Sequence, residues 1–261
     1  MSLHDAYARL TPFEIAFPDR GRFEEVAAAA IDEADRGGID ATDPDAFSTL
    51  ASVGDFLSEL HGDEVPRVEL IQHGLLLFHA VHFSRAGRPL FLLDRAAARA
   101  LVLSAPGRPP EPPTHAGYVQ LPQHLFWAAA GPDGGSPESV DGLFWTVSRA
   151  MRVHVLPIVG VRPDRAGFGA LSLPEAPLAH AADWMHADIR GSSNDFTSRL
   201  PGAELDDLYA VEAAGEVFKL LARFFSHLAD LGALREGPRP TEGGVGPRPS
   251  ELGYTLVTQV G

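Results

Sequence analysis

A proline-rich segment divides the chain into two parts of different character. The stretch "APGRPPEPPTHAG" at residues 105–117 contains five prolines, which exclude a helix and favour extended backbone. Before it, apolar residues recur at helical spacing, and after it come short β-branched and aromatic runs. We therefore predict a mainly helical, acidic region over 1–104, a connector at 105–117, and an antiparallel sheet with one long helix over 118–261. The whole chain forms either one continuous domain or two.

The residues before the connector are expected to be mainly helical. The clearest helix is "DRGRFEEVAAAAIDEADRGG", in which Phe23 and Ile31 lie on one apolar stripe and Gly37 and Gly38 end the helix. Further helices are expected after "TDPD" at 42–45, over 68–85, and over 93–104, where Asp94 lies near the first turn. Together these segments predict a helical N-terminal layer.

Strand patterns dominate the residues after the connector. The runs are "GYVQLPQHLFWAAA", "DGLFWTVS", "RVHVLPIVGVR" and "GFGALSLPEA". The connections between the last three runs are too short for crossover helices, which predicts an antiparallel β-meander. Pro122 and Pro157 lack a backbone donor, so their strands should lie at an edge or carry a bulge. A long C-terminal helix over 204–231 and a final strand over 254–260 complete a predicted α+β fold.

Charge and cysteine content narrow the possible functions. The chain has 21 basic and 35 acidic residues, a formal charge of −14, and residues 1–65 carry 15 acids against 4 arginines. Such an acidic chain repels a phosphate backbone, so we expect no nucleic-acid partner. No cysteine is present, which excludes disulfides, thiolate catalysis and cysteine-bound metals.

The same sequence indicates a soluble, cytoplasmic protein with no membrane contact. The N-terminal residues "MSLHDAYARLTPFE" lack the basic and apolar regions of a signal peptide. The longest apolar run, at 74–83, contains two histidines and is far shorter than the roughly 20 residues that a membrane span needs.

The stretch "AHAADWMHADIRGSS" at 179–193 groups four side chains that could serve a site: His180, Asp183, His186 and Asp188. On a helix the first three would spread over about 120° of the surface, and on a strand only His186 and Asp188 would share a face. Spacing alone therefore makes at most half a site, which could hold zinc, manganese or iron if further ligands came from elsewhere. The alternative is an exposed loop anchored by its Trp-Met pair.

His79 and His82 are the first candidates for the missing half of such a site. They lie one turn apart on the helix expected over 68–85, and their neighbours are strongly apolar. The competing interpretation is that both are buried, neutral histidines that hydrogen-bond to backbone or carboxylate groups. No Walker loop, zincin histidine pair or nucleophile elbow occurs in the sequence.

Two functions of different class follow. The first is a binding or scaffold protein that needs no cofactor and acts through protein–protein contacts, with another protein or with itself as partner. It is motivated by the missing catalytic motifs, the uneven charge, and the aromatic residues Trp127, Phe144 and Trp145, which could equally be sheet core. The alternative is a hydrolase or lyase that uses histidine and carboxylate groups, with or without a divalent metal.

Overall fold

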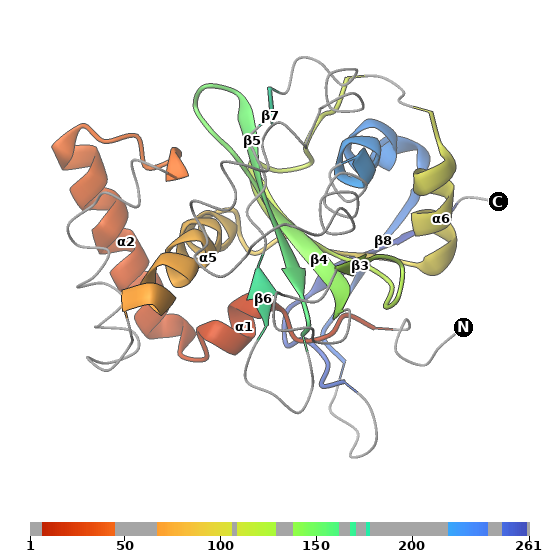
Figure 1. The fold of residues 1–261 in the computed structure, drawn as a ribbon, viewed down its shortest axis with the longest axis horizontal. Coiled ribbons are helices and arrows are strands. Elements are labelled where there is room, and N and C mark those ends of the chain that lie inside the picture. Colours follow the sequence, from red (N-terminus) through yellow and green to blue (C-terminus); the bar gives the residue numbers. More distant parts are fainter. Residues whose placement is uncertain are drawn as a thin grey trace.

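A mixed β-sheet between two groups of helices forms the body of the protein (Figure 1). The computed structural model describes residues 7–44, 67–105, 109–128, 138–161, 168–170, 176–177, 219–239 and 247–259. The helices are α1 (Pro12–Ala16), α2 (Arg20–Gly37), α5 (Arg67–Arg85), α6 (Arg95–Leu103) and the 3₁₀ turn η2 (Leu228–Asp230). Residues 219–227 are also helical. None of the helices in the described residues is long and apolar enough to cross a membrane.

The sheet as a whole is mixed and not an antiparallel meander, although the three consecutive runs predicted to form one do pair antiparallel in chain order. Its strands are β1 (Leu90–Leu93), β2 (Ala116–Gln120), β3 (Trp127–Ala128), β4 (Glu138–Val147), β5 (Arg152–Val159), β6 (Gly169–Ala170), β7 (Ala176–Pro177), β8 (Gly232–Glu236) and β9 (Tyr254–Thr258). They are arranged in the order β6-β5-β4-β2-β1-β9-β8, while β3 pairs with β4 and β7 with β5. β1 is parallel to both β2 and β9, and all other pairs are antiparallel. The α+β content therefore stands, but the sheet is mixed.

Strand β1 lies in the region that was expected to be mainly helical, and the sequence analysis did not predict it. Its sequence is "LFLL", and all four residues are buried. A strand that is covered on both faces reads as a continuous apolar run, without the alternation of a half-exposed strand. The sheet thus takes β1 from before the proline-rich connector and β2 from its end onward.

The helices begin and end at capping residues that are recognisable in the sequence. The Asp19 side chain accepts a hydrogen bond from Arg22 N at 3.0 Å where α2 begins, and Gly38 ends the helix with a left-handed φ of 67°. Asp94 accepts from Ala97 N at 2.6 Å at the start of α6. The helices predicted over these segments are confirmed, as is α5. The helix expected after residue 45 lies outside the described residues.

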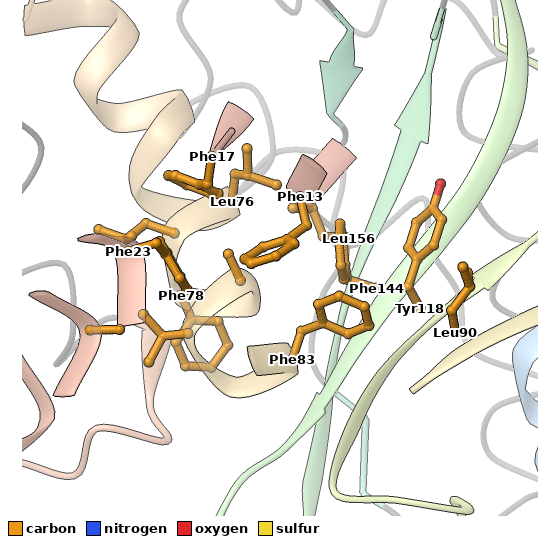
Figure 2. Packing of buried hydrophobic residues seen from close by; sticks show 14 of the residues in the cluster. Phe13, Phe17, Phe23, Leu76, Phe78, Phe83, Leu90, Tyr118, Phe144 and Leu156 are labelled. Atoms are coloured by element: carbon orange, nitrogen blue, oxygen red, sulfur yellow. The ribbon is translucent and has the colours of Figure 1, made fainter. Parts of the chain in front are cut away.

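Side chains on β1 alternate between the two helical layers. Leu90 and Leu92 pack with α1, α2 and α5, whereas Phe91 and Leu93 pack with α6 and helical residues 219–227. Figure 1 shows α2 and α5 on one side of the sheet and α6 on the other. In the first layer, Phe13 lies between Phe23 and Phe83, at ring-centroid distances of 5.0 and 5.5 Å (Figure 2).

The first and last described segments are bound together. Leu10 N donates to Arg248 O at 2.9 Å, and Ser250 N donates to Ala8 O at 2.8 Å. The buried Glu14 carboxylate accepts from Ser250 Oγ at 2.8 Å as well as from Thr11 N. These contacts fix the segment that carries Arg9 against the sheet.

Candidate functional site

Two of the histidines singled out in the sequence lie in the layer formed by α1, α2 and α5. α5 directs His79 toward β4, where its Nδ1 lies 2.9 Å from Thr146 Oγ1 in a hydrogen bond. His82 Nε2 donates to the Ala41 carbonyl oxygen at 2.7 Å. The two residues are 3% and 4% exposed. The burial and the backbone hydrogen bond of His82 match the interpretation of buried, hydrogen-bonded histidines.

Burial also holds these rings neutral near pH 7. Desolvation lowers the pKa of His79 well below its usual value, with smaller contributions from His154 and His82. Burial likewise lowers the pKa of His82 to about 4, although its hydrogen bond to Ala41 acts in the opposite direction. Phe78 packs edge-on against all three rings, at centroid distances of 5.0, 4.9 and 5.8 Å. A general acid or base is most effective when its pKa lies near the working pH, which these values do not provide.

The other half of the predicted site is not described. His180, Asp183, His186 and Asp188 lie outside the described residues, so their proximity to His79 and His82 stays a prediction. Among the residues that are described, no group of three or more histidine or carboxylate side chains could hold a metal ion.

Sequence reasoning missed a buried polar network at Asp141. The register of β4 against β5 shifts between Val140 and Gly142, so Asp141 is the extra residue of a bulge. Its Oδ1 accepts from Arg9 Nε and Nη2 at 3.1 and 2.9 Å, and its Oδ2 accepts from the Tyr118 hydroxyl at 2.7 Å. Bulges commonly redirect a side chain in this way.

The network closes on itself within the core. Gln120 Oε1 accepts from Arg9 N at 2.7 Å, and Gln120 Nε2 donates to Asp141 Oδ2 at 3.3 Å. Burial, with the nearby Asp141, raises the pKa of Tyr118 well above its ordinary value, so its hydroxyl stays protonated and keeps donating. Within the described part of the chain only Nη1 of Arg9 lacks a hydrogen-bond partner in this network. The arrangement stabilises the junction of β2, β4 and the N-terminal segment.

The sheet edge formed by β8 is the exposed feature with the clearest capacity to bind. Ala233, Leu234 and Arg235 are all exposed, Leu234 to 60%. All five residues of β8 pair with β9 without a register shift, and no described strand pairs with the outer side of β8. The sequence analysis did not predict this strand, since 232–236 follows directly on the helix expected over 204–231.

Two of the three aromatic residues noted in the sequence are buried. Phe144 and Trp145 are fully buried, and Trp145 Nε1 donates to Thr114 O at 3.0 Å. Both belong to the core of the sheet. The side chain of Trp127 is not among those that the structure describes.

No family model matches the chain, and no curated protein matches it.

Proposed function

We propose that this is a binding or scaffold protein that joins another protein chain by strand addition at the outer edge of β8. The observation that carries the proposal is the difference between the two edges of the sheet. In the part of the chain that the structure describes, one edge ends in β6 and β7, which have two residues each, and the other ends in β8, which has five.

An open strand edge presents a row of backbone N–H and C=O groups that can pair with a further strand. Proteins that avoid such pairing shorten the edge strand, bend it with a bulge, or place charged residues or proline on it. β6 and β7 are short in this sense. β8 is longer and has no proline or bulge: its sequence is "GALRE", its register against β9 is continuous, and its central Leu234 is exposed. Its two charged residues, Arg235 and Glu236, are the only protective feature of this kind that it carries. Backbone pairing would supply affinity, and side chains such as Leu234 would supply specificity.

The described titratable clusters favour binding over catalysis. A substrate must reach a catalytic group, but His79, His82 and Asp141 are all buried. The alternative of a histidine and carboxylate hydrolase or lyase, with or without a divalent metal, therefore rests on His180, Asp183, His186 and Asp188. The binding proposal involves no cofactor, metal or nucleic acid, and the cytoplasmic location stays a prediction.

Site-specific photo-crosslinking tests the proposal. The photoreactive residue p-benzoyl-phenylalanine replaces Leu234 in the full chain, and in a control it replaces Leu103, which is more exposed at 86% and lies on α6. In cells that express the chain, we expect one protein adduct of reproducible mass from position 234, identified by mass spectrometry, and none of that mass from position 103.

The backbone requirement is tested by adding Ala233→Pro to the photoreactive variant. Proline removes an amide donor and restricts the strand, so the adduct should disappear while the far-ultraviolet circular dichroism spectrum stays unchanged. Equal crosslinking at 103 and 234, or no adduct at either position, would contradict binding at β8.

A further inference from the structure

We infer that the occupant of the β8 edge is a second copy of this chain, paired antiparallel so that Leu234 lies opposite the partner's Leu234. This inference rests on the proposed function and goes beyond it by naming the partner and the register. The observations behind it are the sequence of β8, the exposure of its three central residues, and the shortness of the opposite edge of the sheet.

Symmetry restricts how two copies of β8 can pair. If a two-fold axis perpendicular to the sheet relates two antiparallel β8 strands, each side chain and its copy in the partner lie on the same face of the joint sheet. Opposite residues must then share a face, so odd-numbered residues pair with odd and even with even, because side chains alternate along a strand. Only the register centred on Leu234 pairs all five residues of β8. It places Ala233 opposite Arg235 and Gly232 opposite Glu236.

The side chains suit this register. The two leucines lie on the same face, where cross-strand Cβ atoms are about 4.5–5.5 Å apart, so each covers apolar surface that the other exposes. The long Arg235 side chain faces the small Ala233, and Glu236 faces Gly232. Within the described residues, neither Arg235 nor Glu236 makes an ion pair that this arrangement would break.

Neighbouring registers are less favourable. A shift of two residues toward the C-terminus sets Arg235 opposite the partner's Arg235, and like charges directly opposite each other destabilise a strand pair. A shift of two residues toward the N-terminus sets Leu234 opposite the partner's Gly232, which removes the leucine contact. Either shift also leaves part of β8 unpaired.

Pairing between two copies also closes the assembly. The same edge is used on both chains, so each copy satisfies the other and no open β8 edge is left. Growth from the far side of the sheet is less favoured as far as the described residues show, because β6 and β7 offer only two residues each there. The product is a dimer with one continuous sheet.

The dimer should be weak and should depend on salt. A five-residue strand edge buries much less than the roughly 1,200–2,000 Å² of a standard stable interface. Each copy also carries a formal charge of −14, and the mutual repulsion is reduced by dissolved salt. The monomer and the dimer should therefore exchange, with more dimer at higher protein concentration and higher salt.

Cysteine crosslinking of purified protein tests the partner and the register together. The chain has no cysteine of its own, so each variant has one thiol. A cross-strand Cβ separation of about 5 Å is close to what a disulfide spans. Under mild oxidation, Leu234→Cys should form a covalent dimer. Ala233→Cys alone should form at least tenfold less, whereas an equimolar mixture of Ala233→Cys and Arg235→Cys should form a mixed dimer.

Sedimentation of the unmodified protein provides the second measurement, and a concentration-dependent dimer is expected. Equal crosslinking of all single-cysteine variants, or a wild-type monomer at every concentration with no crosslink at position 234, would overturn the second copy as occupant. If a different protein is then photo-crosslinked at position 234 in cells, only the choice of partner fails. If no adduct forms there either, the proposed function fails with it.

Discussion

Asp141 shows how a single residue can anchor two distant segments. A bulge in β4 turns its carboxylate toward Arg9 and Tyr118, and both residues are buried. Gly142, the next residue, must lack a side chain, because a Cβ there would lie 2.6 Å from the Tyr118 hydroxyl oxygen. Asp141 and Gly142 together therefore determine how β4 packs against β2.

Asp141→Asn should strongly destabilise the fold. The change removes the negative charge and leaves the buried Arg9 guanidinium without an ionic partner, which typically costs about 3–5 kcal/mol. Tyr118→Phe removes only one hydrogen bond to a charged group and should cost about 1.5–3 kcal/mol. Urea unfolding of both variants measures these costs. A smaller loss for Asp141→Asn than for Tyr118→Phe would contradict the role given to the charge pair.

The lowered pKa of His82 makes stability fall in mild acid. The unfolded chain binds a proton at His82 below its ordinary pKa of 6.5, whereas the folded chain does so only near 4. Stability is therefore fully present above pH 6.5 and falls as the pH drops toward 4, by about 1.4 kcal/mol per unit. Across this window His82 contributes a loss on the order of 3 kcal/mol.

Urea unfolding at several pH values, compared between wild type and His82→Gln, isolates this contribution. The variant should show a shallower decline between pH 6.5 and 4. Leu103, an exposed leucine on α6 without a titratable group, provides the control, and Leu103→Ala should keep the wild-type slope. The same slope in wild type and His82→Gln would show that the histidine is not held neutral by burial.

At the scale of elements, local sequence signals placed α2, α5 and α6 and the two longest strands. Asp19 and Gly38 mark the ends of α2, and the aromatic and β-branched runs mark β4 and β5. Burial of His79 and His82 followed from their apolar neighbours. β1 was missed because a short apolar run between two helical segments does not distinguish a buried strand from a helix.

The elements that carry the candidate site depend on contacts between distant residues. β8 consists of Gly, Ala, Leu, Arg and Glu, and several of these residue types are disfavoured in strands; it is a strand because β9 pairs with it. The bulge at Asp141 likewise depends on the pairing of β4 with β5. No local pattern specifies either feature, so single-sequence reasoning could not place them.

Paired substitutions in β1 test its central place in the sheet. Leu92 packs with the layer of α1, α2 and α5, and Leu93 packs with the opposite layer. Leu92→Ala and Leu93→Ala should each cost about 2–5 kcal/mol, because each opens a cavity in a different core. Leu234→Ala, at an exposed leucine, should change stability by less than about 0.5 kcal/mol in dilute protein. Denaturant unfolding measures all three, and a large cost for only one β1 residue would contradict burial on both faces.

On the scale of the whole molecule, net charge opposes the association that β8 favours. The formal charge of −14 is spread unevenly, with its greatest excess of acids in residues 1–65. Repulsion between two such chains weakens as salt shortens the range of electrostatic interaction, from about 30 Å at 0.01 M to about 10 Å at 0.1 M.

The dimer dissociation constant should therefore fall as salt rises. Sedimentation velocity at low and moderate sodium chloride concentrations measures it, and we expect at least a threefold decrease between 0.01 and 0.1 M, as about 0.65 kcal/mol of relieved repulsion would give. A constant that rises with salt would instead indicate attraction between opposite charges, which the β8 register does not provide.

Hydrogen exchange at β8 tests the central claim most directly, because pairing at an edge protects backbone amides that are otherwise open to solvent. Exchange is followed residue by residue in the wild-type chain at low and high protein concentration, with the amides of α6 as an internal control. We expect the amides on the outer side of β8 to exchange more slowly at high concentration, while those of α6 stay constant. Unchanged exchange throughout β8, at a concentration where sedimentation detects dimer, would show that the chains associate elsewhere and would contradict pairing at this edge.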